Sequence, residues 1–272
     1  MRLIITKNVG LWTATYVKER LKDFNPKDCF VGGESNFVLG LPTGGTAVDL
    51  YKNLVAFYKA KEVSFEHITT FNMDEYISLP RDHKESYWTF MHEHLFNHVD
   101  MNKKNINIPD GNAADIKKFC REYEEKIKVA GGVDLFIGGV GENGHIAFNE
   151  PFSSFSSRTR DKELNKNTIE ANARFFGGDI NLVPKKAITV GIQTLLDSKE
   201  VLIMMTGVKK ALALQHCLEG PITHQWPVSV LQMHQKALIV VDEDAASELK
   251  VKTYRFFKDF EDEYSYIEDL CK

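Results

Sequence analysis

The chain has 272 residues, 43% of them hydrophobic, and a formal net charge of −4 at pH 7. This length and apolar content suffice for one large core, so we expect a single domain over residues 1–272, and the intermingled acidic and basic residues argue against nucleic acid as a partner. Apolar runs such as residues 201–205 are far shorter than the roughly 20 residues of a membrane helix, and the first residues lack the apolar region of a signal peptide, so we expect a cytoplasmic protein with no membrane span.

Short apolar runs typical of strands alternate with longer amphipathic stretches of helical period. The expected strands cover residues 37–41, 68–71, 133–138, 187–190, 201–206 and 237–241. The expected helices cover residues 47–59, 87–97, 116–129, 209–217 and 247–257. The alternation predicts an α/β fold, an open, mostly parallel, Rossmann-like sheet with helices on both faces. Ligands bind such sheets beyond the carboxyl ends of the strands, so the loops at those ends are the places to look for a site.

The first of these loops joins the strand at residues 37–41 to the following helix and reads Pro-Thr-Gly-Gly-Thr. Adjacent glycines allow the backbone to approach an anion closely, while threonine hydroxyls and the start of a helix add donors and partial positive charge. The alternative is a plain tight turn with Thr46 as the helix N-cap. The Gly-Lys-Ser/Thr ending of a Walker loop and the three-glycine dinucleotide spacing are both absent, which disfavours nucleotide binding at this loop.

The second loop follows residues 68–71 and places Asp74 and Glu75 at the same edge of the sheet. A carboxylate partly shielded from water has a raised pKa, which suits a base that removes a proton from carbon. Adjacent side chains in an extended segment point in different directions, so we expect only one of the two to face a substrate. The alternative is a solvated acidic turn without a catalytic part.

The third loop follows the strand at residues 133–138 and contains four glycines within seven residues, with His145 and Glu150 close behind. So many glycines add little to packing and indicate close approach of the backbone to another group. Histidine and glutamate are groups that exchange protons near neutral pH. We therefore expect proton transfer at this loop, although a lone histidine is more often an ordinary core or surface residue.

Lys209 and Lys210 follow the strand at residues 201–206, where a cation can reach a phosphate bound at the sheet edge. We expect Lys209 to be solvated, whereas solvation and anion binding remain equally open for Lys210. Three histidines within residues 92–98 suggest a metal site, but they lack the HExxH order and two of them point to different helix faces, so we expect no metal.

The cysteines have no CxxC spacing, which indicates neither a zinc site nor a set of disulfides. We expect buried, unreactive thiols at all of these positions, namely Cys29, Cys120, Cys217 and Cys271.

Taken together, seven segments match in chain order the motifs of the glucosamine-6-phosphate deaminase family, which this sequence therefore resembles over nearly its whole length. These segments are residues 39–46, 70–76, 141–151, 157–160, 171–176, 210–214 and 249–253. The resemblance implies an aldose-to-ketose isomerisation with loss of ammonia, turning glucosamine 6-phosphate and water into fructose 6-phosphate and ammonia without metal or organic cofactor.

The resemblance also implies a role for each of four catalytic residues. His145 assists opening of the sugar ring, and Asp74 moves a proton from carbon 2 to carbon 1 of the open chain. Glu150 positions and charges the histidine, and Asn143 orients it by a hydrogen bond. The phosphate and sugar oxygens are held, by the same resemblance, by Thr43, Gly44, Gly45, Thr46, Arg174 and Lys210.

Two positions depart from the family pattern. Asn143 stands where many relatives carry aspartate, and an amide cannot accept the charge that a carboxylate accepts. Some bacterial members are hexamers activated by N-acetylglucosamine 6-phosphate bound between subunits, and Phe256 stands where those members have tyrosine. We expect a homo-oligomer, a hexamer by resemblance, whose activator site includes Met1, Ser153, Arg160 and Lys162.

Two other functions fit parts of the pattern. A 6-phosphogluconolactonase shares the architecture, but it activates water and has no use for a base such as Asp74 placed to move a proton between carbons. A non-catalytic sugar-phosphate sensor could keep the phosphate loop and Lys210 while dispensing with Asp74 and His145, both of which are present. The sequence favours the deaminase over both.

Overall fold

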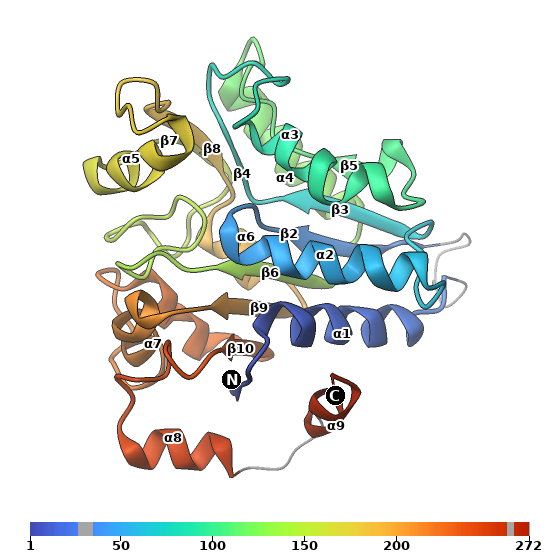
Figure 1. Ribbon diagram of the computed structural model, residues 1–272. Coiled ribbons are helices and arrows are strands. Elements are labelled where there is room, and N and C mark those ends of the chain that lie inside the picture. Colours follow the sequence, from blue (N-terminus) through green and yellow to red (C-terminus); the bar gives the residue numbers. More distant parts are fainter. Residues whose placement is uncertain (27–34, 260–263, 272) are drawn as a thin grey trace.

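The computed structural model describes residues 1–26, 35–259 and 264–271. Within them a seven-stranded sheet runs through the molecule in the order β1-β10-β9-β6-β2-β3-β5, and every neighbouring pair is parallel (Figure 1). Its strands are β1 (Arg2–Ile5), β2 (Phe37–Leu41), β3 (Ile68–Asn72), β5 (Ile106–Asn107), β6 (Leu135–Gly139), β9 (Glu200–Met205) and β10 (Ala237–Val241).

Helices cover both faces of this sheet, as predicted. One face packs against α1 (Val9–Lys22), α2 (Gly45–Lys59), α3 (Tyr87–His94) and α9 (Ser265–Leu270). The other packs against α4 (Ile116–Val129), α6 (Ile192–Leu196), α7 (Ala211–Leu218) and α8 (Val251–Lys258). A hydrophobic core lies on each face of the sheet, and successive residues of a strand point alternately into one core or the other. Ile203 thus packs on one face and Leu202 on the other, as the two-residue period of a strand requires. Fully buried parallel strands therefore read as continuous apolar runs.

A small antiparallel sheet stands beside the large one, at the upper left of Figure 1. In the described chain it joins β4 (Asp74–Tyr76), β8 (Lys186–Thr189) and β7 (Arg160–Glu163), followed by α5 (Lys166–Asn172) and the 3₁₀ helix η3 (Ala173–Phe176). The segment 187–190 is thus a strand, as expected, but it lies outside the main parallel sheet. Its residues read like those of a parallel strand because the small sheet has its own buried side, which includes Tyr76 and Ala187.

The chain reverses its direction of progress across the sheet between β2 and β6. From β2 it proceeds to β3 and β5 on one side, and from β6 to β9 and β10 on the other. Such a reversal between two neighbouring strands is the place where open α/β sheets bind ligands. The first and third predicted loops therefore lie at this one position.

The predicted buried state of the cysteines is confirmed for Cys120 and Cys217, whereas Cys271 is only partly buried and Cys29 lies outside the described residues. In the described part of the chain, no helix combines the length and apolar character needed to cross a membrane. Within the same residues, no three His, Cys, Asp or Glu side chains are grouped so that they could hold a metal ion.

Candidate active site

The loop after β2 forms an open cradle at the start of α2. Gly44 has a φ of +100° and occupies the capping position without a side-chain hydrogen bond, so the alternative in which Thr46 caps the helix is wrong. A Cβ placed on Gly44 or Gly45 would meet no atom within 4 Å, which leaves the backbone open to a ligand. The first amides of a helix lack intrahelical acceptors, so this open turn offers donors to an anion. Thr43 and Thr46 flank the glycines and are half-buried.

Two cations converge on the same edge from other segments. Lys210 ends the 3₁₀ helix η4 (Val208–Lys210) before α7. Its pKa is lowered by burial, which the charge of Glu142 opposes and the repulsion of Arg174 and Lys209 reinforces. Lys209 has a carboxylate at 3.4 Å, Glu142, but no carboxylate of a described residue lies within 4.0 Å of the Lys210 or Arg174 cation. Two neighbouring positive charges without a bound counterion favour an anion such as phosphate.

Asp74 begins β4 at the carboxyl end of β3 and is 7% exposed. Its carboxylate accepts no hydrogen bond from any residue in the described ranges, and burial, with the charge of Glu75, raises its pKa from 3.8 to about 8. Burial also raises the pKa of the surrounding tyrosines, and the Asp74 charge adds to each rise, which places their hydroxyls near it: Tyr51, Tyr76, Tyr87 and Tyr123. A shielded carboxylate without fixed donors is ready to take a proton.

Glu75 points elsewhere, as predicted for the adjacent residue. Its carboxylate accepts hydrogen bonds from the backbone amides of Tyr87 and Trp88, at 3.1 and 2.9 Å, where α3 begins. It also accepts one from the amide of Tyr76 at 2.8 Å. A carboxylate at a helix N-terminus satisfies amides that would otherwise lack acceptors. Glu75 therefore fixes α3 against β4, and Asp74 is the carboxylate of the pair that remains available.

The loop after β6 holds a chain of hydrogen bonds that we call the relay, formed by His145, Asn143 and Glu150. The Nδ1 of His145 lies 2.7 Å from the Oδ1 of Asn143, and the Nδ2 of Asn143 donates to the Oε2 of Glu150 at 2.9 Å. Because an ionised carboxylate only accepts, it holds the amide of Asn143 with its oxygen toward the imidazole. Nδ1 of neutral histidine is then the donor, and the basic Nε2 is left free for a substrate.

Glu150 differs from Asp74 although both are buried. Burial works to raise the pKa of Glu150, but hydrogen bonds from His145, Thr168 and Asn143 outweigh it and leave the pKa lowered. Thr168, on α5, donates to Oε1. Gly141 lets the imidazole of His145 approach the backbone closely, because a Cβ there would stand 2.1 Å from the ring. The relay is therefore built around a carboxylate whose pKa is lowered, so that it is ionised at neutral pH.

The end of β8 fixes the second and third loops relative to each other. Thr189 pairs with Asp74 across the small sheet, and its hydroxyl accepts the amide of Phe148 at 3.1 Å. The carbonyl of Val190 accepts Asn149 Nδ2 at 2.8 Å. Asp74 and the loop of the relay thus rest on the same two residues of the scaffold. With the loops after β2 and β9, the strand-end loops of four neighbouring strands meet at this edge.

The residues expected in an activator site do not all come together in one chain. Arg160 and Lys162 lie on one side of β7 and Ser153 is buried in the preceding segment, whereas Met1 precedes β1, far from β7 (Figure 1). Burial lowers the pKa of Arg160, whose guanidinium donates to the carbonyl of Arg158 at 3.2 Å.

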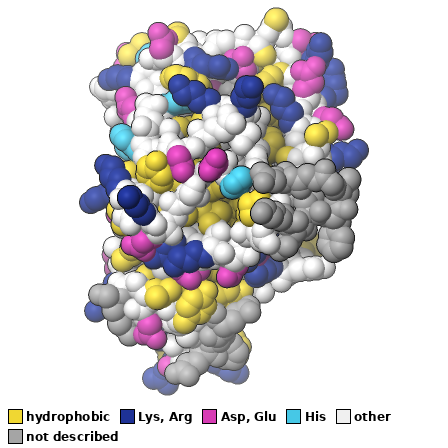
Figure 2. Space-filling view, turned by 90° about the vertical axis from the view of Figure 1, so that its right-hand side faces the viewer, with side chains coloured by type: hydrophobic (Ala, Val, Ile, Leu, Met, Phe, Trp, Pro, Cys, Tyr) yellow, Lys and Arg dark blue, Asp and Glu magenta, His cyan; other side chains and the backbone are white. Residues whose placement is uncertain are grey.

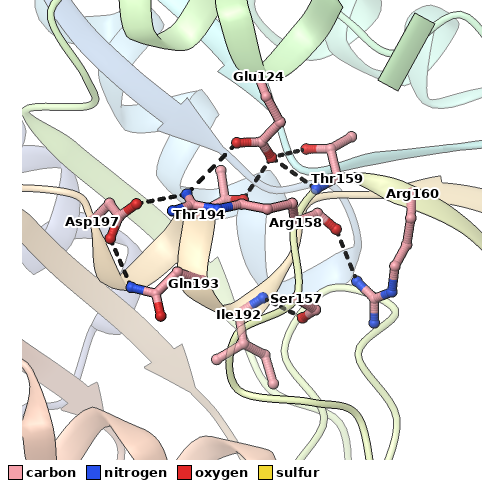
Figure 3. A network of polar contacts seen from close by, with 9 residues as sticks. All are labelled: Glu124, Ser157, Arg158, Thr159, Arg160, Ile192, Gln193, Thr194 and Asp197. Carbon is pink, nitrogen blue, oxygen red and sulfur yellow. Dashed lines mark hydrogen bonds and ion pairs between the residues drawn. The ribbon is translucent and has the colours of Figure 1, made fainter. Parts of the chain in front are cut away.

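Figure 3 shows how the segment leading into β7 is held. Glu124 of α4 accepts the amide and the hydroxyl of Thr159, at 2.7 and 2.5 Å, and the hydroxyl of Thr194 at 2.6 Å. Arg158 pairs with Asp197 at 2.6 Å. Glu124 and Thr168 were missed in the sequence, because a glutamate and a threonine on polar helices give no local sign of a distant partner.

An anion cradle, an isolated basic carboxylate and a histidine relay around the switch point of an open parallel sheet define the class, an α/β enzyme acting on a phosphorylated sugar. The profile described as glucosamine-6-phosphate isomerases/6-phosphogluconolactonase matches residues 14–240. The chain belongs to this family.

Curated relatives and solved structures narrow the position within the family. The glucosamine-6-phosphate deaminase of Yersinia enterocolitica is 57% identical over 266 residues, covering 97% of this chain and 98% of that protein. A solved structure described as a monomeric glucosamine-6-phosphate deaminase has a TM-score of 0.85 and 38% identity, covering 92% of this chain and 100% of that chain. The 6-phosphogluconolactonase of Thermotoga maritima has a TM-score of 0.67 at 21% identity, covering 89% and 98%, which shows a shared fold alone. The chain thus stands on the deaminase side of the family.

Proposed function

We propose that this chain converts glucosamine 6-phosphate and water into fructose 6-phosphate and ammonia. The observation that carries the proposal is Asp74, a buried carboxylate with no hydrogen-bond donor from the described residues and a pKa of about 8, set beside an anion cradle. A lactonase activates water and does not need a carboxylate that moves a proton between two carbons of the substrate. Close relatives named glucosamine-6-phosphate deaminase support the same reaction.

The phosphate of the substrate is placed by the cradle and the two cations. Thr43, Gly44, Gly45 and Thr46 present backbone and hydroxyl donors, and Lys210 and Arg174 neutralise its charge. Bound phosphate stabilises the protonated form of Lys210, whose lowered pKa reflects burial beside other cations.

Ring opening falls to the relay. The Nε2 of neutral His145 accepts the proton of the hydroxyl on carbon 1 and returns a proton to the ring oxygen, which breaks the ring bond and leaves an aldehyde. Asn143 keeps the donor on Nδ1, and Glu150 stabilises the imidazolium that forms, 3.5 Å from its Oε2. Asn143 therefore fixes the orientation of the imidazole, and Glu150 supplies the negative charge that stabilises the imidazolium.

The proton transfer between carbons falls to Asp74. Its carboxylate removes the proton from carbon 2, and the same proton is delivered to carbon 1, which leaves an imine at carbon 2. Water adds to the imine carbon and ammonia leaves, giving the ketone of fructose 6-phosphate. The protonated amine of the bound substrate lies next to Asp74 and lowers its pKa, so the base is ionised when it is needed.

The reaction is tested with the unmodified protein in deuterium oxide. We expect equal amounts of ammonia and fructose 6-phosphate from glucosamine 6-phosphate, with the carbon 2 proton retained at carbon 1 of the product in place of solvent deuterium, and no acceleration of 6-phosphogluconolactone hydrolysis. Rapid lactone hydrolysis without ammonia release would contradict the proposal.

We further propose that Arg160, Lys162 and Ser153 form an activator site completed by Met1 of a neighbouring copy of the chain. The support is the partly buried Arg160, which has no carboxylate of a described residue within 4.0 Å although the charge of Asp161 acts on it, and the distance of Met1 from β7 within one chain. The site requires an oligomer, whereas one relative is described as monomeric. The oligomeric state of this chain should therefore be measured by sedimentation equilibrium. N-acetylglucosamine 6-phosphate should raise the rate at low substrate, and Phe256→Tyr should enlarge the effect. A hyperbolic rate curve unchanged by the acetylated sugar phosphate would remove this site.

A further inference from the structure

A cavity lies at the edge of the main sheet and is lined in part by β5 and by Tyr123. Its volume is about 400 Å³, within the range of about 300–1,000 Å³ usual for small-molecule sites. The edge strand β5 forms its base, and side chains of α3 and α4 form its walls. Figure 2 faces the right-hand side of Figure 1, and in its upper part dark-blue basic side chains outnumber the magenta acidic ones between them.

The charge of the lining is positive. Arg81, Lys103 and Lys126 face a single carboxylate, Asp110, which lies 3.3 Å from Arg81. Neither Lys103 nor Lys126 has a carboxylate of any described residue within 4.0 Å. Two lysines that are free of such pairing and share one cavity attract an anion, and phosphate is the anion that lysine commonly binds.

The same cavity offers flat aromatic walls. Trp88 and His92 of α3 are stacked, with ring centroids 3.8 Å apart and planes inclined by 25°. Phe119 of α4 also lines the cavity, with its ring centroid 5.8 Å from that of Tyr123. Aromatic faces next to lysines are the combination with which proteins hold a planar base and its phosphate.

We propose that this cavity binds a small anion with a planar ring, of the nucleoside monophosphate class, with the phosphate on Lys103 and Lys126 and the ring against Trp88. The site is distinct from the phosphate cradle, which is built by other strands and lacks aromatic walls among the residues described above. Tyr123 lines this cavity and is also one of the tyrosines around Asp74. Its hydroxyl donates to the carbonyl of Asn72 at 2.8 Å, two residues before Asp74.

Equilibrium dialysis of the full chain with adenosine 5′-monophosphate tests the proposal without reference to turnover. We expect one bound molecule per chain. The double variant Lys103→Ala/Lys126→Ala should weaken binding roughly tenfold, the order of one charge-assisted hydrogen bond. The control Lys117→Ala/Lys128→Ala removes two exposed lysines of α4 that have no carboxylate of a described residue within 4.0 Å. It should bind like the parent, as should Lys210→Ala of the cradle.

The contributions of the base and of the phosphate are measured by repeating the dialysis with adenosine alone and with inorganic phosphate alone. Adenosine and inorganic phosphate should each bind at least tenfold more weakly than the monophosphate. The nucleotide should quench tryptophan fluorescence in the parent and not in Trp88→Phe, one of three tryptophans in the chain. Absence of binding at millimolar nucleotide, equal binding of phosphate alone, equal loss in the control double variant, or loss in Lys210→Ala would each overturn the proposal. Quenching that persists in Trp88→Phe would do the same.

Discussion

Asp74 and Glu150 are both buried carboxylates at the same edge of the sheet, and they are 7% exposed each, yet their pKa values move in opposite directions. Asp74 lies on a short strand whose backbone bonds are used in the sheet and whose side chain meets no donor in the described chain. Glu150 lies in a loop where an asparagine, a threonine and the histidine converge on it. Burial alone therefore does not set the proton affinity, since the donors and the charge of His145 outweigh it at Glu150, whereas the charge of Glu75 adds to it at Asp74.

The comparison also separates the two roles. A carboxylate that must gain and lose a proton in each turnover works best with a pKa near the working pH, which donors would lower. A carboxylate that must hold a neighbour in place works best when it stays ionised. The predictions below test whether the absence of donors at Asp74 and their presence at Glu150 produce these roles.

Replacing Asp74 by asparagine should have the largest effect. The amide keeps the shape but cannot accept the proton from carbon 2, so kcat should fall by roughly a hundred- to ten-thousand-fold, the usual contribution of positioned proton transfer. Binding of fructose 6-phosphate, measured by calorimetry, should change little because the cradle is intact. Turnover within a few-fold of the parent would show that another group is the base.

The same variant should be more stable than the parent at alkaline pH. Because the folded pKa of Asp74 is raised from 3.8 to about 8, the folded protein keeps a proton that the unfolded chain releases. The stability of the parent therefore falls as pH rises through this window, and Asp74→Asn removes that loss, on the order of a few kcal/mol. Guanidinium unfolding at pH 5 and pH 8.5 measures it. A difference between the proteins that is the same at both pH values would show that Asp74 is not buried as a lone acid.

Replacing Glu150 by glutamine should cost roughly ten- to a hundredfold in kcat, less than loss of the base itself. Glutamine can donate to Asn143 and turn its amide, so that the imidazole loses its fixed tautomer and the nearby negative charge. The nitrogen-15 shifts of His145 should change accordingly. Unchanged shifts together with reduced activity would point to a purely structural role.

The sequence predicted most of the main sheet because each of its buried strands is a local apolar run, and α4 was predicted within its observed bounds. Asp115 caps that helix by accepting the amide of Lys118, and Gly131 and Gly132 follow its end. Helix α1 was missed because it is buried on several sides, so its sequence lacks a polar face. Strand β4 was missed because its three residues pair with β8, more than a hundred residues away.

The sequence predicted the candidate site as three loops and a lysine, because those features are local. It did not predict how the pKa of each carboxylate is shifted. That Asp74 lacks donors while Glu150 has them depends on which distant residues face each carboxylate. Thr168 reaches Glu150 from α5, and Arg174 approaches Lys210 from η3, by folding of the segment between β7 and β8. No spacing in the sequence fixes such meetings, whereas the family resemblance did assign Arg174.

Thr168→Val should give the smallest effect and is the most selective probe of the difference between the two carboxylates. It keeps the shape and removes one donor from Glu150, so the pKa of that carboxyl should rise toward the value that burial favours. We expect a several-fold lower kcat, with the acid limb of the pH profile moved to higher pH, because Glu150 must be ionised to hold Asn143. Thr194→Val is the matched control, since it removes a donor from Glu124, whose contacts lie at β7 and α6, and should leave the acid limb in place. A profile that moves equally in both variants would mean that the donors act through general stability and not through the charge of Glu150.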